Sequence, residues 1–115
     1  MDSIRKLKPL KFCGRSLVDL RAFPAGARQD AGYQLGKVQE GMEPSDWKPM
    51  RAIGPGAREI RIREAGGAFR IIYVVHLPKT IYVLHCFQKK TRATSRGDIE
   101  LARQRYNALL REVNR

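Results

Sequence analysis

Cysteine, acidic residues and long apolar runs are all scarce in this sequence of 115 residues. Two cysteines, with no Cys-x-x-Cys pair and no cluster of cysteine and histidine, are too few for a disulfide framework and match no metal-site spacing. No apolar run approaches the roughly 20 residues that span a bilayer, and the amino-terminal segment lacks the apolar core of a secretory signal. We therefore expect a reduced, cytoplasmic protein that needs no cofactor and does not cross a membrane.

Positive charge is what the sequence has in excess. It holds 23 lysines and arginines against 11 aspartates and glutamates, a formal net charge of +12, and 43% of its residues are hydrophobic. A chain of this length forms one domain, residues 1–115, which excludes a multidomain enzyme, and its apolar content is that of a folded protein. Between Glu64 and Asp98 there is no acidic residue at all. Such a charge attracts polyanions, so nucleic acid is the first partner to consider and an anionic membrane surface the second.

The first half of the chain predicts an edge strand, two helices and a long connector. Residues 4–13 mix apolar and basic side chains around a proline, which is typical of an edge strand. Ser16 is predicted to cap a short helix over residues 17–23, and a second helix is predicted over residues 25–40 to complete a helical hairpin. Residues 41–57 are rich in proline and glycine and predict a loop.

The second half predicts three strands and a helix. The strands cover residues 58–64, 68–76 and 80–88, and Gly66-Gly67 is the predicted turn of the first hairpin. The final helix runs from Ser95, a predicted cap, to about residue 114. Its apolar stripe consists of Ile99, Ala102, Tyr106, Leu109, Leu110 and Val113. The predicted fold is α+β, a small antiparallel β-sheet with the helical hairpin on one face and a C-terminal helix.

The hydrophobic pattern also predicts a strand register. It places Ile60 opposite Tyr73 in the first hairpin, and it places Tyr73 opposite Leu84 and Ile71 opposite Cys86 in the second. These side chains share the face that we expect the helical hairpin to cover, and Cys86 is a core residue there rather than a nucleophile. On the opposite face the C-terminal helix is expected to cover one end, which carries Ile72, Val74, Ile81 and Val83.

The other end of that opposite face is predicted to gather cations around an aromatic ring. Its members are Arg61, Arg63, Arg70, His85, Phe87 and Lys89. Arg63 is predicted directly opposite Arg70, and like charges across a ladder are unfavourable unless an anion binds between them. Guanidinium and ammonium groups hold phosphate, an aromatic ring stacks an unpaired base, and a lysine among cations has a lowered pKa suited to a base. The pattern favours RNA binding and cleavage over an ordinary basic surface.

The two histidines do not form a ribonuclease pair in this register. His76 lies across from Ile81, which separates it from His85 by roughly 13 Å along the sheet, too far for both to act on one phosphate. His76 is therefore a hairpin-end residue. His85 lies on the basic face and could assist there, although a structural role is favoured.

Six segments of the chain carry a recognisable family pattern. They are residues 23–41, 46–50, 58–64, 69–75, 83–95 and 99–106. The most specific element is the aromatic-x-Lys-Lys-Thr motif at residues 87–91, which ends the last predicted strand. In these segments the chain resembles the RelE/ParE toxin superfamily, specifically the HigB-like, phage-derived toxins of bacterial toxin–antitoxin systems. Ser95 departs from the pattern, since many relatives have proline there, and this affects only the start of a helix.

The resemblance implies a ribosome-dependent endonuclease that cleaves mRNA in the A site, against 16S ribosomal RNA. It implies catalytic roles for Arg63, Arg70, Lys89 and Lys90. The residues implied in RNA binding are Arg61, His85, Phe87, Arg92 and Arg96. The implied partner is an antitoxin with a helix-turn-helix domain, and DNA is bound only through the complex with that antitoxin.

Two other functions remain open on the sequence. One is a non-catalytic inhibitor of DNA gyrase with the same fold, as in ParE-like relatives, although the Phe-x-Lys-Lys-Thr motif counts against it. The other is a nucleic-acid-binding prophage remnant without activity, which composition alone does not separate from the endonuclease.

Overall fold

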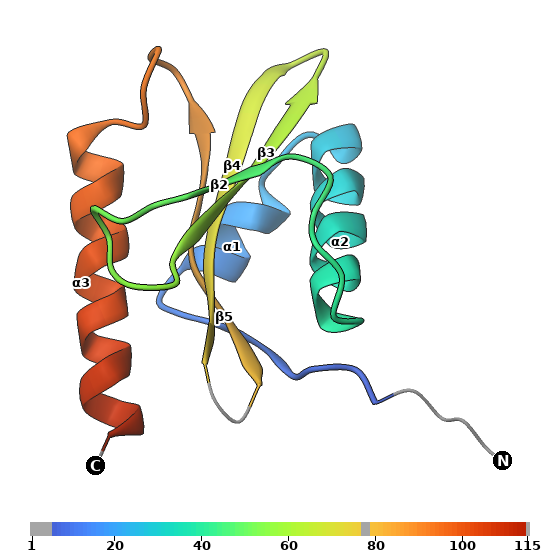
Figure 1. Ribbon diagram of the computed structural model, residues 1–115. Helices are drawn as coiled ribbons and strands as arrows, with labels where there is room; N and C mark the ends of the chain where they lie inside the picture. Colours follow the sequence, from blue (N-terminus) through green and yellow to red (C-terminus); the bar gives the residue numbers. More distant parts are fainter. Residues whose placement is uncertain (1–5, 77–78, 115) are drawn as a thin grey trace, which may run out of the picture.

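The computed structural model describes residues 6–76 and 79–114 (Figure 1). In chain order its elements are β1 (Leu10–Phe12), α1 (Ser16–Arg21), α2 (Ala25–Gln39), β2 (Trp47–Pro49), β3 (Arg58–Glu64), β4 (Gly67–His76), β5 (Thr80–Lys89) and α3 (Arg96–Val113). The strands form one sheet in the order β1-β5-β4-β3-β2, antiparallel except for the parallel pair of β1 and β5. The α+β fold and the edge position of the first strand are confirmed, but β1 is shorter than the predicted strand over residues 4–13, of which residues 4 and 5 lie outside the described residues.

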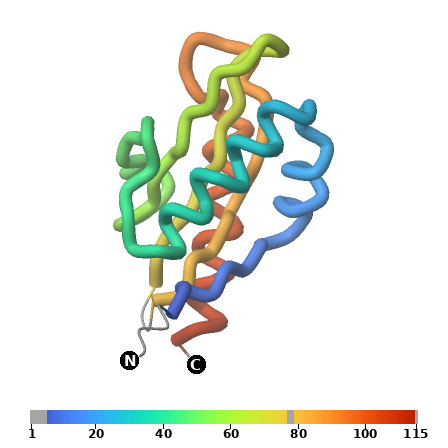
Figure 2. The backbone as a smooth tube through the Cα atoms, turned by 90° about the vertical axis from the view of Figure 1, so that its right-hand side faces the viewer, coloured from blue at the N-terminus to red at the C-terminus, as the bar shows by residue number. Residues whose placement is uncertain are grey.

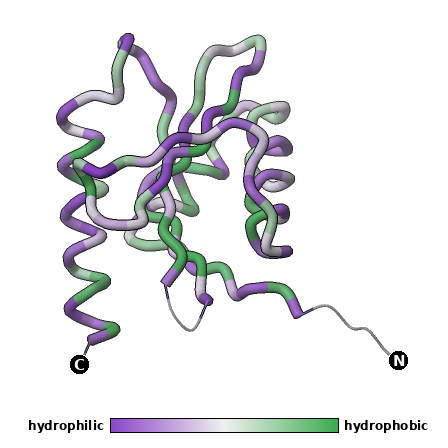
Figure 3. Tube along the Cα trace, viewed as in Figure 1, coloured by the Kyte–Doolittle hydropathy of each residue, from purple (hydrophilic) through white to green (hydrophobic). Residues whose placement is uncertain are grey.

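The sheet lies between helices, with α2 on one side and α3 on the other (Figures 1 and 2). Each face has its own core. Ile60, Ile71 and Cys86 pack with the residues of α1 and α2, whereas Ile72 and Val74 pack with α3. Figure 3 shows hydrophobic residues in the β4–β5 hairpin and hydrophilic ones at the tip of the connection between β5 and α3. The predicted division of the helices between the two faces is therefore confirmed.

Ser16 begins α1 but does not cap it. The capping position is Arg15, without a side-chain hydrogen bond, and the Ser16 hydroxyl is fully buried and donates to the carbonyl of Val83 at 3.1 Å. The predicted cap is wrong because this hydroxyl turns inward and fixes the helix to β5. At the other end of the chain Ser95 does cap α3, since its Oγ accepts from the backbone N–H of Asp98.

The prediction of a loop over residues 41–57 was wrong for the part that forms β2. The irregular remainder of this segment packs against α3. Met50 and Ile53 are buried in the α3 core, and the Tyr106 hydroxyl donates to the carbonyl of Pro55 at 2.6 Å. Proline and glycine signalled irregular backbone here, but the apolar side chains between them decide where that backbone lies.

The first hairpin is shifted by two residues from the predicted register. Glu64 pairs with Gly67, so the connecting residues are Ala65 and Gly66, and Gly67 itself has a φ of 132° that suits glycine. Ile60 pairs with Ile71 rather than Tyr73. Because side chains alternate along a strand with a period of two, this shift keeps every residue on its predicted face.

The second hairpin contains an irregularity that the sequence did not reveal. Ile71 pairs with Cys86 as predicted, but the register shifts after Ile72, so that Tyr73 pairs with Val83 instead of Leu84. A shift of one residue turns the remainder of β5 over. The predicted faces of Ile81, Val83 and Leu84 were therefore wrong, since Ile81 and Val83 pack with α1 and α2 and Leu84 packs with α3. His76 faces Thr80 rather than Ile81.

The C-terminal helix matches its prediction closely. Its predicted apolar stripe is buried in, or packed against, the core on that face of the sheet. Among the helices in the described ranges, 6–76 and 79–114, none is both long and apolar enough to cross a membrane.

Candidate functional site

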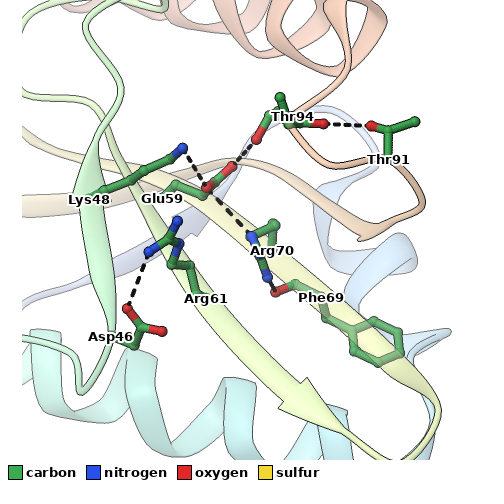
Figure 4. Close-up of polar contacts among 9 residues, drawn as sticks. Asp46, Lys48, Glu59, Arg61, Phe69, Arg70, Thr91 and Thr94 are labelled. Carbon is green, nitrogen blue, oxygen red and sulfur yellow. Dashed lines mark hydrogen bonds and ion pairs between the residues drawn. The ribbon is translucent and has the colours of Figure 1, made fainter.

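Cationic side chains gather near one buried glutamate, Glu59, on the α3 face of the sheet, and Figure 4 shows Lys48, Arg61 and Arg70 beside it. The cations are Lys48 on β2, Arg61 on β3, Arg70 on β4 and Lys89 at the end of β5, and we call these four the cationic cluster. Arg61 pairs directly with Arg70 across the ladder. The predicted opposition of Arg63 and Arg70 was wrong, because the two-residue shift of the hairpin places Arg63 opposite Ala68.

Glu59 is the centre of this arrangement, and its side chain is 0% exposed. Its Oε1 lies 3.5 Å from Nε of Arg70 and 3.9 Å from Nζ of Lys48, while its Oε2 accepts a hydrogen bond from the Thr94 hydroxyl at 2.5 Å. Sequence reasoning missed Glu59, Lys48 and Thr94. The available signal for Glu59 was alternation, because a carboxylate two residues before Arg61 must share its face.

Arg70 lies beneath the surface. Its side chain is 4% exposed, and its Nη1 donates to the carbonyl of Phe69 at 3.0 Å. Burial lowers the pKa of Arg70, and the neighbouring carboxylate of Glu59 opposes this effect. A guanidinium keeps its proton in proteins regardless, so Arg70 contributes a fixed, buried positive charge.

Arg61 and Lys48 are the more accessible members of the cationic cluster. Their side chains are 35% and 39% exposed. Arg61 lies 3.8 Å from the carboxylate of Asp46, and its backbone N–H donates to the Asp46 carbonyl. This contact joins β3 to the segment that leads into β2 and leaves part of the Arg61 guanidinium open to a ligand.

Lys89 has a pKa below its ordinary value. Partial desolvation is the largest cause, and the positive charges of Arg70, Lys48 and Arg61 act in the same direction, while Glu59 opposes them. The strand ends at Lys89, so the exposed Lys90 begins the following connection and is free of the strand alternation. The lysine pair of the family motif thus stands at the boundary between a rigid strand and a loop.

Phe87 and His85 are buried next to the cationic cluster. Their rings stack with centroids 4.7 Å apart, and the two residues are 9% and 5% exposed. The His85 ring is held by Asp98 at the start of α3, with 2.7 Å between Nε2 and Oδ1. This supports the structural role favoured for His85, and the contacts of both rings with RNA stay predictions.

The remaining predicted site residues are exposed around the cationic cluster. Arg63 lies near the end of β3, and its charge acts on Arg70. Arg92 lies in the connection between β5 and α3, and Arg96 is the first residue of α3. The structure thus gathers Arg61, Arg70 and Lys89 and leaves Arg92 and Arg96 at the periphery.

Comparison with known proteins gives a consistent result. A family model described as "Phage derived protein Gp49-like (DUF891)" matches residues 18–107. An arginine mutant of the E. coli toxin RelE, solved in the free state, superposes with a TM-score of 0.63 at 19% identity, over 90% of this chain and 99% of that one. The RelBE2 toxin–antitoxin complex of Mycobacterium tuberculosis gives 0.50 at 18% identity, over 72% and 99%. A search of curated proteins finds no match. At these identities the structural likeness shows a RelE-like fold.

Proposed function

The chain belongs to the phage-derived Gp49-like family and has the RelE-like fold, and on that premise we propose that it is a toxin that cleaves translated mRNA in the ribosomal A site. The observation that carries the proposal is the cationic cluster around Glu59. Four cations held on one face, three of them reachable from solvent, form a site for a phosphate and not for a neutral substrate.

The proposed reaction is an attack by the ribose 2′-hydroxyl on the adjacent phosphorus. Lys89, whose pKa is lowered, takes the hydroxyl proton, and the bond from phosphorus to the 5′ oxygen breaks. Lys90 returns a proton to that leaving oxygen, and Arg63 neutralises its developing charge. The products are a 2′,3′-cyclic phosphate and a 5′-hydroxyl end, so the step consumes no water.

Stabilisation of the pentacovalent transition state falls to the arginines. Arg61 contacts the phosphate oxygens directly, and the buried charge of Arg70 acts from beneath in a region of low dielectric, where charge stabilisation is most effective. This assigns Arg70 a role beneath the substrate, without direct contact with the phosphate.

The ribosome supplies what the site lacks. Phe87 is proposed to contact a base of the mRNA with its exposed edge, because its ring is 9% exposed and stacked on His85, while Arg92 and Arg96 contact 16S ribosomal RNA. Because the site has few groups that orient a flexible strand, the A site must fix the 2′-hydroxyl in line with the leaving oxygen.

The proposed partner is an antitoxin. A solved relative of the same fold is a toxin–antitoxin complex, and a surface with a net charge of +12 favours an acidic partner. We propose that this antitoxin carries a helix-turn-helix domain, and that DNA is bound only through the complex.

Primer extension on mRNA from cells in which the protein is induced tests the proposal. Cuts at codon positions of translated messages, together with growth arrest, are expected. Growth arrest without such cuts would instead indicate an inhibitor of another target, and RNA binding without either effect would indicate an inactive binding module.

A further inference from the structure

We propose that Glu59 and Thr94 form a latch that positions the catalytic groups, with Glu59 holding Arg70 from one oxygen and the β5–α3 connection from the other. This rests on the proposed cleavage activity and adds two positioning residues to it. Neither residue touches the substrate in this account, because Glu59 is 0% exposed and Thr94 is 8% exposed.

The two oxygens of Glu59 serve different elements of the fold. Oε2 accepts from the Thr94 hydroxyl, and Oε1 faces Arg70 and Lys48. Within the described residues Oε1 has no hydrogen-bond partner, so these contacts are ionic. A buried carboxylate is costly to keep unless cations and donors surround it, so its presence here indicates a role that a hydrophobic residue would not fill.

The latch controls where Lys90 and Arg92 lie. Both belong to the short connection over residues 90–95, which begins directly after Lys89, the last residue of β5, and ends at Ser95, the cap of α3. Thr94 is the point at which this connection bonds to the sheet, whereas the Thr91 hydroxyl bonds within the connection, to the carbonyl of Ala93. Without the Thr94 bond, Lys90 loses its fixed position relative to Lys89.

Glu59 also tunes the proposed base. The charged groups around Glu59 and Lys89 are Lys48 and Arg70, which face Glu59, and Arg61, which is paired with Asp46 and acts on Lys89. The negative charge of Glu59 favours the ammonium form of Lys89 and so raises the pKa of that lysine against the surrounding cations. Removing the charge makes the neutral amine easier to form, and the rise of cleavage rate with pH then moves to lower pH.

The test compares matched variants on ribosomes programmed with a defined mRNA at saturating protein. Glu59→Gln removes the buried carboxylate, and Glu64→Gln makes the same change at the exposed end of the same strand. Thr94→Val removes the latch hydroxyl, Thr94→Ser keeps it, and Thr91→Val removes a hydroxyl that does not reach the sheet.

The latch predicts that Glu59→Gln and Thr94→Val slow the chemical step by about tenfold, the cost of one charged hydrogen bond. The protein concentration for half-maximal rate changes little, Thr94→Ser restores the rate, and the pH profile of Glu59→Gln shifts to lower pH. If the two residues had only a structural role, the loss of cleavage rate in each variant would follow its unfolded fraction. The pH profile would stay that of the wild type, and Thr94→Val and Thr91→Val would cleave at the same rate per folded molecule. That result would overturn the latch.

A readout without activity separates the latch from the proposed function. In nitrogen-labelled protein observed by NMR, Glu59→Gln should lower the pKa of Lys89 and Glu64→Gln should not. Amide hydrogen exchange over residues 90–95 should accelerate more in Thr94→Val than in Thr91→Val, because only Thr94 bonds this connection to Glu59. If these shifts occur while the wild-type protein leaves mRNA intact, the latch stands and the endonuclease fails; if they do not occur, the latch is wrong whatever the wild-type activity.

Discussion

Arg61 and Arg70 lie directly opposite each other across β3 and β4, and each is paired with a different carboxylate. Arg61 reaches the exposed Asp46 at 3.8 Å, and Arg70 reaches the buried Glu59 at 3.5 Å. Like charges opposed in this way cost up to about 1 kcal/mol, which these carboxylates offset. One guanidinium is thereby fixed inside the site, and the other is left partly open to a phosphate.

Replacement of the proposed base should slow cleavage strongly without unfolding the protein. Lys89→Gln is expected to lower the cleavage rate by about 100-fold, the usual contribution of a general base. Because Lys89 stands at the end of β5, denaturation should show a stability within about 0.5 kcal/mol of wild type. Lys11→Gln, an exposed change on β1, is the control and should cleave normally. Full activity of Lys89→Gln would remove this residue from the mechanism.

Arg70→Ala should be strongly destabilising as well as inactive. It leaves the buried Glu59 without its main cation, which costs about 3 kcal/mol in urea denaturation. Replacing both partners, with Glu59→Gln and Arg70→Met, should recover part of that loss but no activity. Stability losses that simply add would show that the two side chains do not interact.

Two glycines in α2 leave room for a more stable helix. An added Cβ at Gly32 or Gly36 meets no atom within 4 Å, so each change to alanine should stabilise the protein by up to about 1 kcal/mol. Gly54→Ala is the opposite case, because its Cβ would lie 2.6 Å from the Tyr106 ring and should destabilise by about 1–3 kcal/mol. Thermal melting of the three variants checks both signs, and equal melting temperatures would contradict the packing described.

Ser16 should behave as a core residue and not as a helix cap. Ser16→Ala leaves the buried Val83 carbonyl without this donor and should cost about 1–2 kcal/mol. Ser45→Ala removes an exposed hydroxyl that accepts from Gln34 and Lys37, and it should cost about 0.5 kcal/mol, less than Ser16→Ala. Guanidinium denaturation of Ser16→Ala and Ser45→Ala tests this prediction. Similar midpoints would mean that the buried Ser16 hydroxyl adds nothing to the free energy of unfolding.

Features set by neighbouring residues could be predicted from this sequence, and features set by contacts between distant segments could not. Alternation and capping are local signals, so the three long strands, α2 and α3 were predicted within a residue or two. The shift after Ile72 is different, because it shows only in the pairing of β4 with β5 and in the packing of β5 against the helices. For that reason the sheet face predicted from the sequence was wrong for Ile81, Val83 and Leu84.

The candidate site shows the same division. Alternation gathered Arg61, Arg70 and Lys89 correctly because a two-residue shift preserves faces. It could not tell that the Arg70 side chain is only 4% exposed and lies beside the fully buried Glu59, because burial is set by tertiary packing and not by alternation. Glu59 is on β3, two residues before Arg61, and the sequence shows it there. Only the contacts in the folded structure show that it lies at the centre of the site.

Cleavage of one defined mRNA, either seated in the A site of purified ribosomes or free in solution, tests the central claim most directly. The account predicts that wild-type protein cuts the seated mRNA at a codon position and leaves a 2′,3′-cyclic phosphate, that the free mRNA stays intact, and that Lys89→Gln cuts the seated mRNA about 100-fold more slowly. Intact mRNA on the ribosome, or equal cleavage of seated and free mRNA, would contradict it.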